Sequence, residues 1–223
     1  MNADWVRRTR LWTSWTLSCT VGEYLGMAVA AACAVFVNRL FGEPASVVER
    51  VTVMAVMVGA GAIEGLSIGY FQWRVLRSVF PKLTAASWLI ATITVGALGW
   101  FLGMLPSTLM AGATTELAQS PDLPAGLVAS WAALLGTGLG AVFGGSQWIV
   151  LRRHAHNAWT WMVANAMGWA IAMVILFLAA SWPTEATAAG VVVLLGALAG
   201  LLAGLTVGAV TGWFLLRLRT SGD

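Results

Sequence analysis

The stretch GYFQWRVLR, residues 69–77, returns 75 residues later as GGSQWIVLR, residues 144–152. The two copies agree in register at the first glycine, at the Gln-Trp pair and at the closing Val-Leu-Arg. Each copy ends an apolar segment, so an amide, an indole and a guanidinium follow one another where hydrocarbon gives way to charge. The string therefore predicts the end of a membrane-spanning helix, built twice on one pattern.

The composition of the chain is that of a protein embedded in a membrane rather than dissolved in water. Of the 223 residues, 59% are hydrophobic and 9% are charged, and the mean hydropathy is +0.83. An ordinary soluble domain carries roughly 25% charged residues. Apolar stretches of about 20 residues, the length that crosses the hydrocarbon core, recur along the chain. We predict an all-α integral membrane protein that forms a single membrane domain over residues 1–223.

Six membrane spans are predicted, at about 12–38, 51–74, 87–110, 127–150, 159–181 and 189–216. Pro, Gly and charged residues mark the short segments between these spans. None of the segments is long enough to form a soluble domain, so any function is expected within the membrane or at its surfaces.

The basic residues predict the orientation in the membrane. Ten of the 12 lie on one side of the predicted spans, and only Arg39 and Arg50 lie on the other. The acidic residues of that second side are Glu43, Glu49, Glu116, Asp122 and Glu185. By the positive-inside rule we expect a multi-pass protein with both termini in the cytoplasm. The pI of about 9.4 then reflects topology, and no nucleic-acid partner is expected.

Three tryptophans reveal a repeat in the odd-numbered spans. Trp15, Trp88 and Trp161 follow one another at intervals of 73 residues and open the first, third and fifth spans. Four residues after each tryptophan lies a small or polar residue: Cys19, Thr92 or Asn165. We predict repeat 1 over about 12–77, repeat 2 over about 88–152 and repeat 3 over about 161–217.

The even-numbered spans carry a glycine at every fourth residue. The glycines predicted to pack are Gly61, Gly65 and Gly69, then Gly136, Gly140 and Gly144, then Gly200, Gly204 and Gly208. Residues four apart share one face of a helix, so these glycines form a groove that admits another backbone. In the third copy the glutamine is missing and Trp213 is shifted by one position, so that copy is degenerate.

The residues after each groove are expected to anchor the helix end. Trp73 and Trp148 suit the headgroup region, and Arg77 and Arg152 can reach the lipid phosphates. Gln72 and Gln147 bring amides to the same depth, where interhelical hydrogen bonds are expected.

The repeat also predicts how the spans are arranged. Each unit contains two spans, so all three units run in the same direction. We expect three parallel-repeat helical hairpins around an approximate threefold axis along the membrane normal, with the even-numbered helices striped by glycine.

Spans led by tryptophan, alternating with glycine-striped spans that end in QWRVLR and QWIVLR, resemble bacterial multi-pass membrane proteins with QWxVLR-type repeats. The resemblance covers most of the chain, from about Trp15 to Arg217. It implies a multi-pass helical protein of the bacterial inner membrane and no particular activity, because none is assigned to that group.

The presence of two acidic residues in the membrane spans is not explained by helix packing. Glu23 and Glu64 both fall roughly 16–20 Å from the predicted cytoplasmic end of their spans, near the middle of the bilayer. No Lys, Arg or His occurs at that depth in any span. The two side chains are candidates for an intramembrane proton or cation site, joined by Tyr24, Ser67 or Tyr70. The alternative is a structural pair of neutral acids hydrogen-bonded to neighbouring backbone.

Other polar residues point to packing rather than chemistry. Thr92 and Asn165 are expected to make interhelical hydrogen bonds. His154 and His156 fit contact with lipid headgroups better than a metal site, because the chain has no other histidine. We expect no metal, no cofactor and no enzymatic activity, since no nucleophile-and-base pair, HExxH motif or phosphate-binding loop is present.

Two classes of function follow from these patterns. The first is a non-catalytic membrane module that binds lipid, a hydrophobic ligand or another membrane protein. The second is a small proton- or cation-coupled transporter or channel that uses Glu23 and Glu64. Membrane lipid is the expected partner, and a membrane-protein partner or a homo-oligomer stays open. Carboxyl groups that converge on a polar cavity favour the transporter or channel. Carboxyl groups that point apart, each in a dry helix interface, favour the module.

Overall fold

The computed structural model describes residues 3–109, 124–184 and 186–220, with the side chains of 125, 219 and 220 left out. Three of the acids assigned to the second side of the membrane lie outside the described residues: Glu116, Asp122 and Glu185. Six long helices are found in the described part: α1 (Ala3–Phe41), α2 (Val47–Val79), α3 (Ala85–Leu109), α5 (Ala125–Leu151), α6 (Thr160–Ala180) and α7 (Ala189–Leu215). All six are long and apolar enough to cross a membrane. The predicted all-α membrane fold is confirmed.

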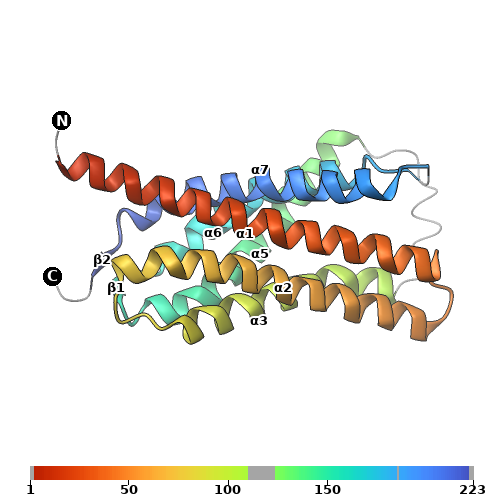
Figure 1. Ribbon diagram of the computed structural model, residues 1–223, viewed down its shortest axis with the longest axis horizontal. Coiled ribbons are helices and arrows are strands. Elements are labelled where there is room, and N and C mark those ends of the chain that lie inside the picture. The colour runs from red at the N-terminus through yellow and green to blue at the C-terminus, as the bar shows by residue number, and fades with distance from the viewer. Residues whose placement is uncertain (1–2, 110–123, 185, 221–223) are drawn as a thin grey trace.

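The helices lie side by side along the long axis of the molecule, and both chain termini lie at one end (Figure 1). We call this the terminal end and the opposite end the far end. Between them, apolar side chains cover much of the outside of the bundle, as lipid contact requires. The protein is therefore a polytopic membrane protein whose outer surface contacts lipid.

Several helices extend beyond the predicted spans. The largest difference is in α1, whose 39 residues correspond to about 58 Å of helix. Its first turns carry Arg7, Arg8 and Arg10, which are exposed. Hydropathy marks only the apolar part of a helix, and these charged turns continue it beyond the apolar span. The helix ends where Gly42 adopts a φ of +58°, a conformation that favours glycine.

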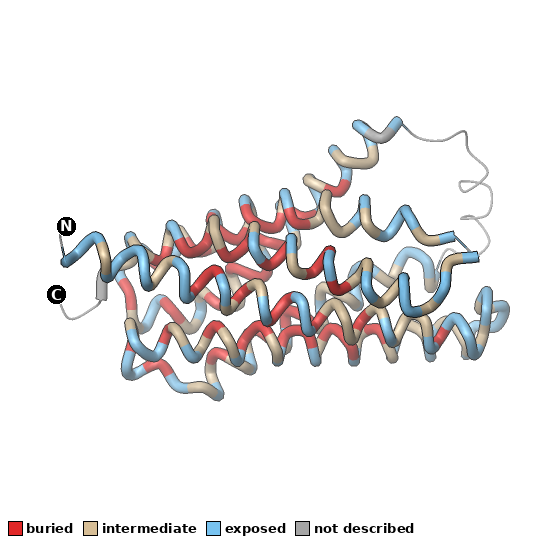
Figure 2. Tube along the Cα trace, turned by 45° about the horizontal axis from the view of Figure 1, so that its top comes forward, coloured by how far each residue is buried: buried red, intermediate tan, exposed pale blue. Residues whose placement is uncertain are grey.

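The six helices form a closed ring in chain order. Each helix packs against the next one along the chain, and α7 closes the ring by packing against α1. The contact between α3 and α5 is the smallest in the ring. The first turns of α5 also diverge from the other helices at the far end (Figures 1 and 2). The ring is therefore tight except between α3 and α5.

The closest backbone approaches join one repeat to the next. A side-chain carbon at Gly65, Gly140 or Gly204 would fall 2.5–2.7 Å from a backbone oxygen of the facing helix. Those oxygens belong to Thr92, Asn165 and Cys19, respectively, which occupy matching positions in the three repeats. Each glycine-striped helix thus packs on the first helix of the following repeat, with α7 returning to α1.

The core at the terminal end repeats threefold around the centre of the ring. Trp15, Trp88 and Trp161 are fully buried. The ring centroid of Trp161 lies 5.4 Å from that of Trp15 and 6.4 Å from that of Trp88, both in edge-to-face geometry. Three leucines from the glycine-striped helices α2, α5 and α7 complete this cluster: Leu76, Leu151 and Leu215. Buried residues are concentrated in this half of the bundle, as Figure 2 shows.

A two-stranded ladder adds to the terminal end. β1 (Ala155–His156) follows α5 and pairs antiparallel with β2 (Arg219–Thr220), which follows α7. We expected only a basic loop at residues 152–158. Two residues per strand are too few for hydrophobic periodicity to mark, which is why the sequence did not predict the ladder.

Candidate functional site

Two carboxyl groups meet inside the bundle, beyond the tryptophan cluster. Glu23 lies about two turns from Trp15 on α1, and Glu64 lies about two turns from Gln72 on α2. Both side chains are buried, at 3% and 7% exposure, and their carboxyl groups lie beside each other, close enough for a hydrogen bond when one of them is protonated. The two acids that lie at matching depth in the sequence therefore converge on one place.

Small residues make room for this pair. A side-chain carbon at Gly204 of α7 would fall 2.7 Å from Cβ of Glu23, and one at Gly26 of α1 would fall 2.5 Å from Cγ of Glu64. The glycines thus allow the acids to lie between closely spaced backbones, as the small-residue faces predicted.

The rest of the hydrogen bonding around the pair is incomplete. Trp100 Nε1 of α3 donates a hydrogen bond of 2.7 Å to Glu64 Oε2. Glu23 Oε1 is buried and has no hydrogen-bond partner in the described structure. A buried acceptor without a partner is costly, and such atoms often mark a site that a ligand or water completes.

The pair carries no basic counter-ion among the described residues. The one ion pair found there joins Arg7 to Asp4, on the exposed first turns of α1. A hydrogen bond between two carboxyl groups requires a proton on at least one of them. The arrangement can therefore exchange protons or accept a cation, and both acids cannot be charged at once without a large cost.

A cavity of about 360 Å³ adjoins the pair, and we call it the lateral cavity. It lies between α3, α5 and α6, and Glu64 forms part of its wall. Apart from this carboxyl group and two indoles, the lining is apolar. The side chains at its mouth are each at least 40% exposed on the outside of the bundle: Leu98, Leu102, Leu135, Val142 and Phe177. The lateral cavity therefore opens sideways, toward the lipid.

The composition of α3 explains the opening. Gly99 and Gly103 line the lateral cavity, and a side-chain carbon at either would have no neighbour within 4 Å. Pro106 follows inside the same helix and removes one backbone donor. The far half of α3 thus presents little side-chain volume to α5, and the two helices pack loosely there.

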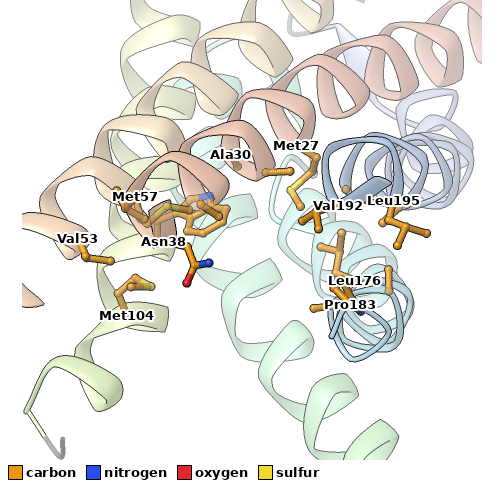
Figure 3. Close-up of a pocket in the computed structure, with 18 of the residues that line it drawn as sticks. Met27, Ala30, Asn38, Val53, Met57, Met104, Leu176, Pro183, Val192 and Leu195 are labelled. Atoms are coloured by element: carbon orange, nitrogen blue, oxygen red, sulfur yellow. The ribbon is translucent and has the colours of Figure 1, made fainter. Parts of the chain in front are cut away.

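A second cavity of about 540 Å³ lies at the far end, and we call it the outer cavity (Figure 3). Its lining comes from five of the six helices, and the loop residues Gly42, Pro44 and Pro183 contribute to it. Figure 3 shows Met27, Met57 and Met104 pointing into this region from three different helices. The two cavities share five lining residues: Met27, Trp100, Met104, Leu176 and Ala180. They are separated by little more than these side chains.

The 73-residue repeat accounts for much of the wall. Met27, Trp100 and Met173 occupy matching positions and all line the lateral cavity. Sequence reasoning did not select these residues, although the 73-residue interval that relates Trp15 to Trp88 also relates Met27 to Trp100.

The same interval shows that the acid is an exception. The positions that match Glu23 in the other repeats hold Gly96 and Trp169, and both line the lateral cavity. Trp169 is 8% exposed, packs against Phe143 and has a buried indole nitrogen without a hydrogen-bond partner in the described structure. The residues that line the lateral cavity therefore include one acidic acceptor, Glu64, and one tryptophan with an unpaired indole N–H, Trp169.

The remaining candidates for the carboxylate site lie elsewhere. Tyr24 and Tyr70 are exposed on the outside of the bundle, and Ser67 is half-buried. None of the three lines either cavity. Tyr24 directly follows Glu23 and Tyr70 lies six residues after Glu64, and these offsets turn both tyrosines away from the face of the acid. Ser67 lies three residues after Glu64, on the same side of α2, but it does not line a cavity.

The polar residues near the tryptophan cluster form a buried network. Gln147 Nε2 donates to Gln72 Oε1 at 3.0 Å and to Thr92 Oγ1 at 3.2 Å, and Trp161 Nε1 donates to Gln147 Oε1 at 2.8 Å. The Asn165 amide instead donates to the Trp161 backbone oxygen of its own helix, so its predicted interhelical bond is absent from the described structure. Trp15 donates to Thr211, which takes the place of the missing glutamine in repeat 3.

The helix-end residues form three similar pairs. The guanidinium of Arg77 lies 5.2 Å from the ring centroid of Trp73, and that of Arg152 lies 5.0 Å from that of Trp148. Arg217 stacks on Trp213 in the same way, although both are shifted along the sequence. Each arginine thus makes a cation–π contact one turn from its tryptophan, a contact that the sequence argument did not include.

His154 and His156 lie in the basic loop after α5. Among the described residues they do not belong to a group of three or more His, Cys, Asp and Glu side chains that could hold a metal ion. Partial burial and the charges of Arg153 and Lys82 lower the pKa of His154, which favours the neutral form of this side chain.

Comparisons with protein-family models, with curated proteins and with solved structures found no match to the chain.

Proposed function

We propose that this membrane protein binds a hydrophobic ligand in the lateral cavity and has no catalytic activity. The observation that carries the proposal is an apolar cavity of about 360 Å³ that opens on the lipid-facing side of the bundle. Sites for small molecules commonly have volumes of about 300–1,000 Å³ and mostly apolar walls with a few polar groups. The methionines of the wall can repack around a ligand of irregular shape.

The position of the opening supports entry from the bilayer. A ligand that dissolves in lipid can pass between α3 and α5 without crossing a polar surface, because the mouth is lined by exposed apolar side chains. We further propose that the terminal end faces the cytoplasm of a bacterial inner membrane. The arginines of that end, among them Arg77 and Arg152, suit anionic lipid headgroups.

A binding role fits the buried chemistry better than catalysis. Glu64 lies next to an indole, and no side chain that could act as a nucleophile is hydrogen-bonded to either acid in the described structure. Nucleophilic catalysis requires a nucleophile and a base within hydrogen-bond reach of each other.

The second candidate is a small proton- or cation-coupled transporter or channel that uses Glu23 and Glu64. The convergence of the two carboxyl groups favours it, because the pair can exchange protons at mid-membrane depth. Reconstituted liposomes distinguish the two candidates. A transporter or channel gives a pH-dependent flux of protons or cations that the Glu23→Gln and Glu64→Gln variants lose. A binding module gives no such flux in any variant.

The test of the proposed function fills the lateral cavity. Leucine at Gly99 would project into it without a backbone clash, whereas leucine at Gly138 would project into open space elsewhere on α5. Both replacements relieve a helix of one glycine, so their effects on helix stability should match. The purified variants are photolabelled with adamantyl diazirine, a small uncharged probe, and the labelled residues are mapped by mass spectrometry.

We expect labelling of the buried Phe143 and Trp169 in the wild type and in Gly138→Leu, and its loss in Gly99→Leu. Equal labelling in all three proteins would contradict the proposal, because the probe would then reach these residues by a route that leucine at position 99 does not block. Absence of labelling at both residues in the wild type would also contradict it.

A further inference from the structure

We infer that the ligand of the lateral cavity is a lipophilic organic cation, held by the Glu64–Glu23 carboxyl pair and bounded by the indoles of Trp100 and Trp169. This inference rests on the proposed function and narrows the ligand by its charge. Four observations carry it, and each comes from a different part of the site.

The first observation is the sign of the site. Glu64 is the ionisable side chain in the wall of the lateral cavity, and its partner Glu23 is also an acid. No Lys, Arg or His contacts the pair in the described structure. A buried carboxylate without a counter-ion is costly, so the site is neutral only when it holds protons or when a ligand supplies positive charge.

The second observation is the aromatic lining of the cavity. Trp100, Trp169, Phe143 and Phe177 line the same cavity as Glu64, and Trp100 is hydrogen-bonded to it. The face of an aromatic ring attracts a cation, and the attraction increases when the cation is out of water. Phosphonium, ammonium and delocalised aromatic cations combine this charge with enough apolar surface to enter from lipid.

The third observation is the unused hydrogen-bonding capacity. The indole nitrogen of Trp169 is buried without a partner, and so is Glu23 Oε1. The four described helices that face the pair across the ring, α3, α5, α6 and α7, contain no ionisable side chain that could satisfy them. An acceptor atom beside the cationic centre of the ligand would pair with the Trp169 N–H.

The fourth observation is the asymmetry of the ring. The repeat places Gly96 and Trp169 where α1 has Glu23. In the glycine-striped helices, Leu139 of α5 lies eight residues before Gln147, just as Glu64 of α2 lies eight residues before Gln72. Packing at this depth is therefore achieved without acids in another repeat, so the two acids are not needed to build the fold.

A cation and a proton compete for the same pair. When a cation binds, a proton that the pair held leaves to water, and the total charge of the site is unchanged. Cys19 on α1 is the other titratable group near Glu23. The residues of α3 and α7 that contact the pair are uncharged: Trp100, Gly200 and Gly204. Binding of the cation should therefore become tighter as the pH rises.

The test uses two ions of nearly equal size and opposite charge, tetraphenylphosphonium and tetraphenylborate. Binding of each to the full-length protein in an uncharged maltoside detergent is measured by equilibrium dialysis at pH 6 and pH 8. The proteins are the wild type, Glu64→Gln and the matched control Glu43→Gln. Glu43 is an exposed acid in the loop after α1. Melting temperature and gel filtration establish that each variant is folded.

We expect saturable binding of tetraphenylphosphonium to the wild type and to Glu43→Gln, tighter at pH 8 than at pH 6. Loss of the counter-charge in Glu64→Gln should weaken that binding by about 30-fold or more. Tetraphenylborate should neither bind there nor displace the cation. If Glu64→Gln does not fold, the comparison of the two ions and the pH dependence on the wild type still test the inference.

Competition identifies the source of the cation. Displacement of tetraphenylphosphonium by a long-chain alkylammonium indicates a lipid-like amine, and displacement by ethidium indicates a compact free cation. Displacement by neither would overturn the inference.

Equal binding of the two ions, or unchanged binding of the cation to Glu64→Gln, would also overturn the inference. The proposed function would survive these results if Gly99→Leu still abolished photolabelling by the uncharged probe. Failure of that photolabelling experiment would instead remove the proposed function itself.

Discussion

The two halves of this bundle use the same repeat for different purposes. In the terminal half, two sets of matching core positions each hold one residue type: tryptophan at 15, 88 and 161, and leucine at 76, 151 and 215. In the far half, the positions that match Glu23 hold glycine and tryptophan, and those that match Met27 hold tryptophan and methionine. The terminal half is closed, and both cavities lie toward the far end.

The difference shows how a site is made in a repeated ring. Three equal side chains that meet around one axis fill the centre, and the space there is then closed. Where the three side chains differ, their volumes and charges do not match, and a cavity with one charged wall remains. Departures from the repeat therefore locate the site better than the repeat itself.

The largest expected effect comes from blocking a close approach in the packed half. In Gly65→Leu, the new side chain would begin 2.5 Å from the Thr92 backbone oxygen, and neither backbone can move without disturbing the ring. We expect a loss of more than about 3 kcal/mol, enough to prevent folding. Thermal unfolding and gel filtration of the purified protein measure it.

Gly59→Leu is the matched control on the same helix. A side-chain carbon at Gly59 has no neighbour within 4 Å, so this variant should be as stable as the wild type or more stable. A Gly65→Leu protein that melts like the control would show that the glycine face is not a close contact.

The second prediction concerns the polar network of the packed half. Leucine at Gln147 would leave the N–H of Trp161 and the carbonyl oxygen of Gln72 without a partner inside the protein. We expect a loss of about 1–3 kcal/mol for such unpaired groups. Thr137→Val, which removes an exposed hydroxyl bonded to its own helix, should cost much less. Equal melting temperatures of the two variants would show that the network adds no stability.

Much of the fold could be predicted from the sequence, because apolar length and the tryptophan and glycine intervals are local signals. They gave six membrane helices and one repeat. They could not say which neighbour each glycine face meets. Gly65 and Gly140 face the next repeat, and this choice depends on how the ring closes rather than on either helix alone.

The site was predictable only in part. Glu23 and Glu64 were selected because charge at mid-membrane depth is rare, and the structure brings them together. Trp100, Trp169 and the lateral cavity were not selected, because an indole in an apolar span looks like ordinary packing. Tyr24 and Tyr70 were grouped with the acids by sequence distance, whereas the turn of the helix points them outward.

The third prediction separates the charge of the far half from its packing. In Glu64→Gln, the amide oxygen can still accept the hydrogen bond from Trp100, and the amide N–H can donate to Glu23. We expect the free energy of unfolding to change by less than about 1 kcal/mol. Glu64→Leu removes the acceptor and should cost about 1–3 kcal/mol. If both variants lose stability equally, the negative charge itself stabilises the fold. The two acids would then be a structural pair rather than a ligand site.

The smallest expected effect lies at the start of α2, outside the membrane-spanning part. Glu49 accepts hydrogen bonds from the backbone N–H of Ser46 at 3.0 Å and of Ala45 at 2.9 Å, which lower the pKa of its carboxyl group. The pKa is thus lower in the folded than in the unfolded protein. The stabilisation is complete above the unfolded value of about 4.3 and is lost as the pH falls through the folded value.

Glu49→Gln should therefore melt slightly below the wild type at pH 7, and the gap should narrow as the pH falls through the lowered pKa of the wild-type carboxyl group. Glu43→Gln serves as the control, because it makes the same chemical change at an exposed acid outside the helix cap. A gap for Glu49→Gln that stays constant down to pH 3 would mean that the glutamine disturbs the cap by its shape rather than by its missing charge. Because this cap lies far from both the tryptophan cluster and the carboxyl pair, ligand binding in the lateral cavity should be the same in this variant as in the wild type.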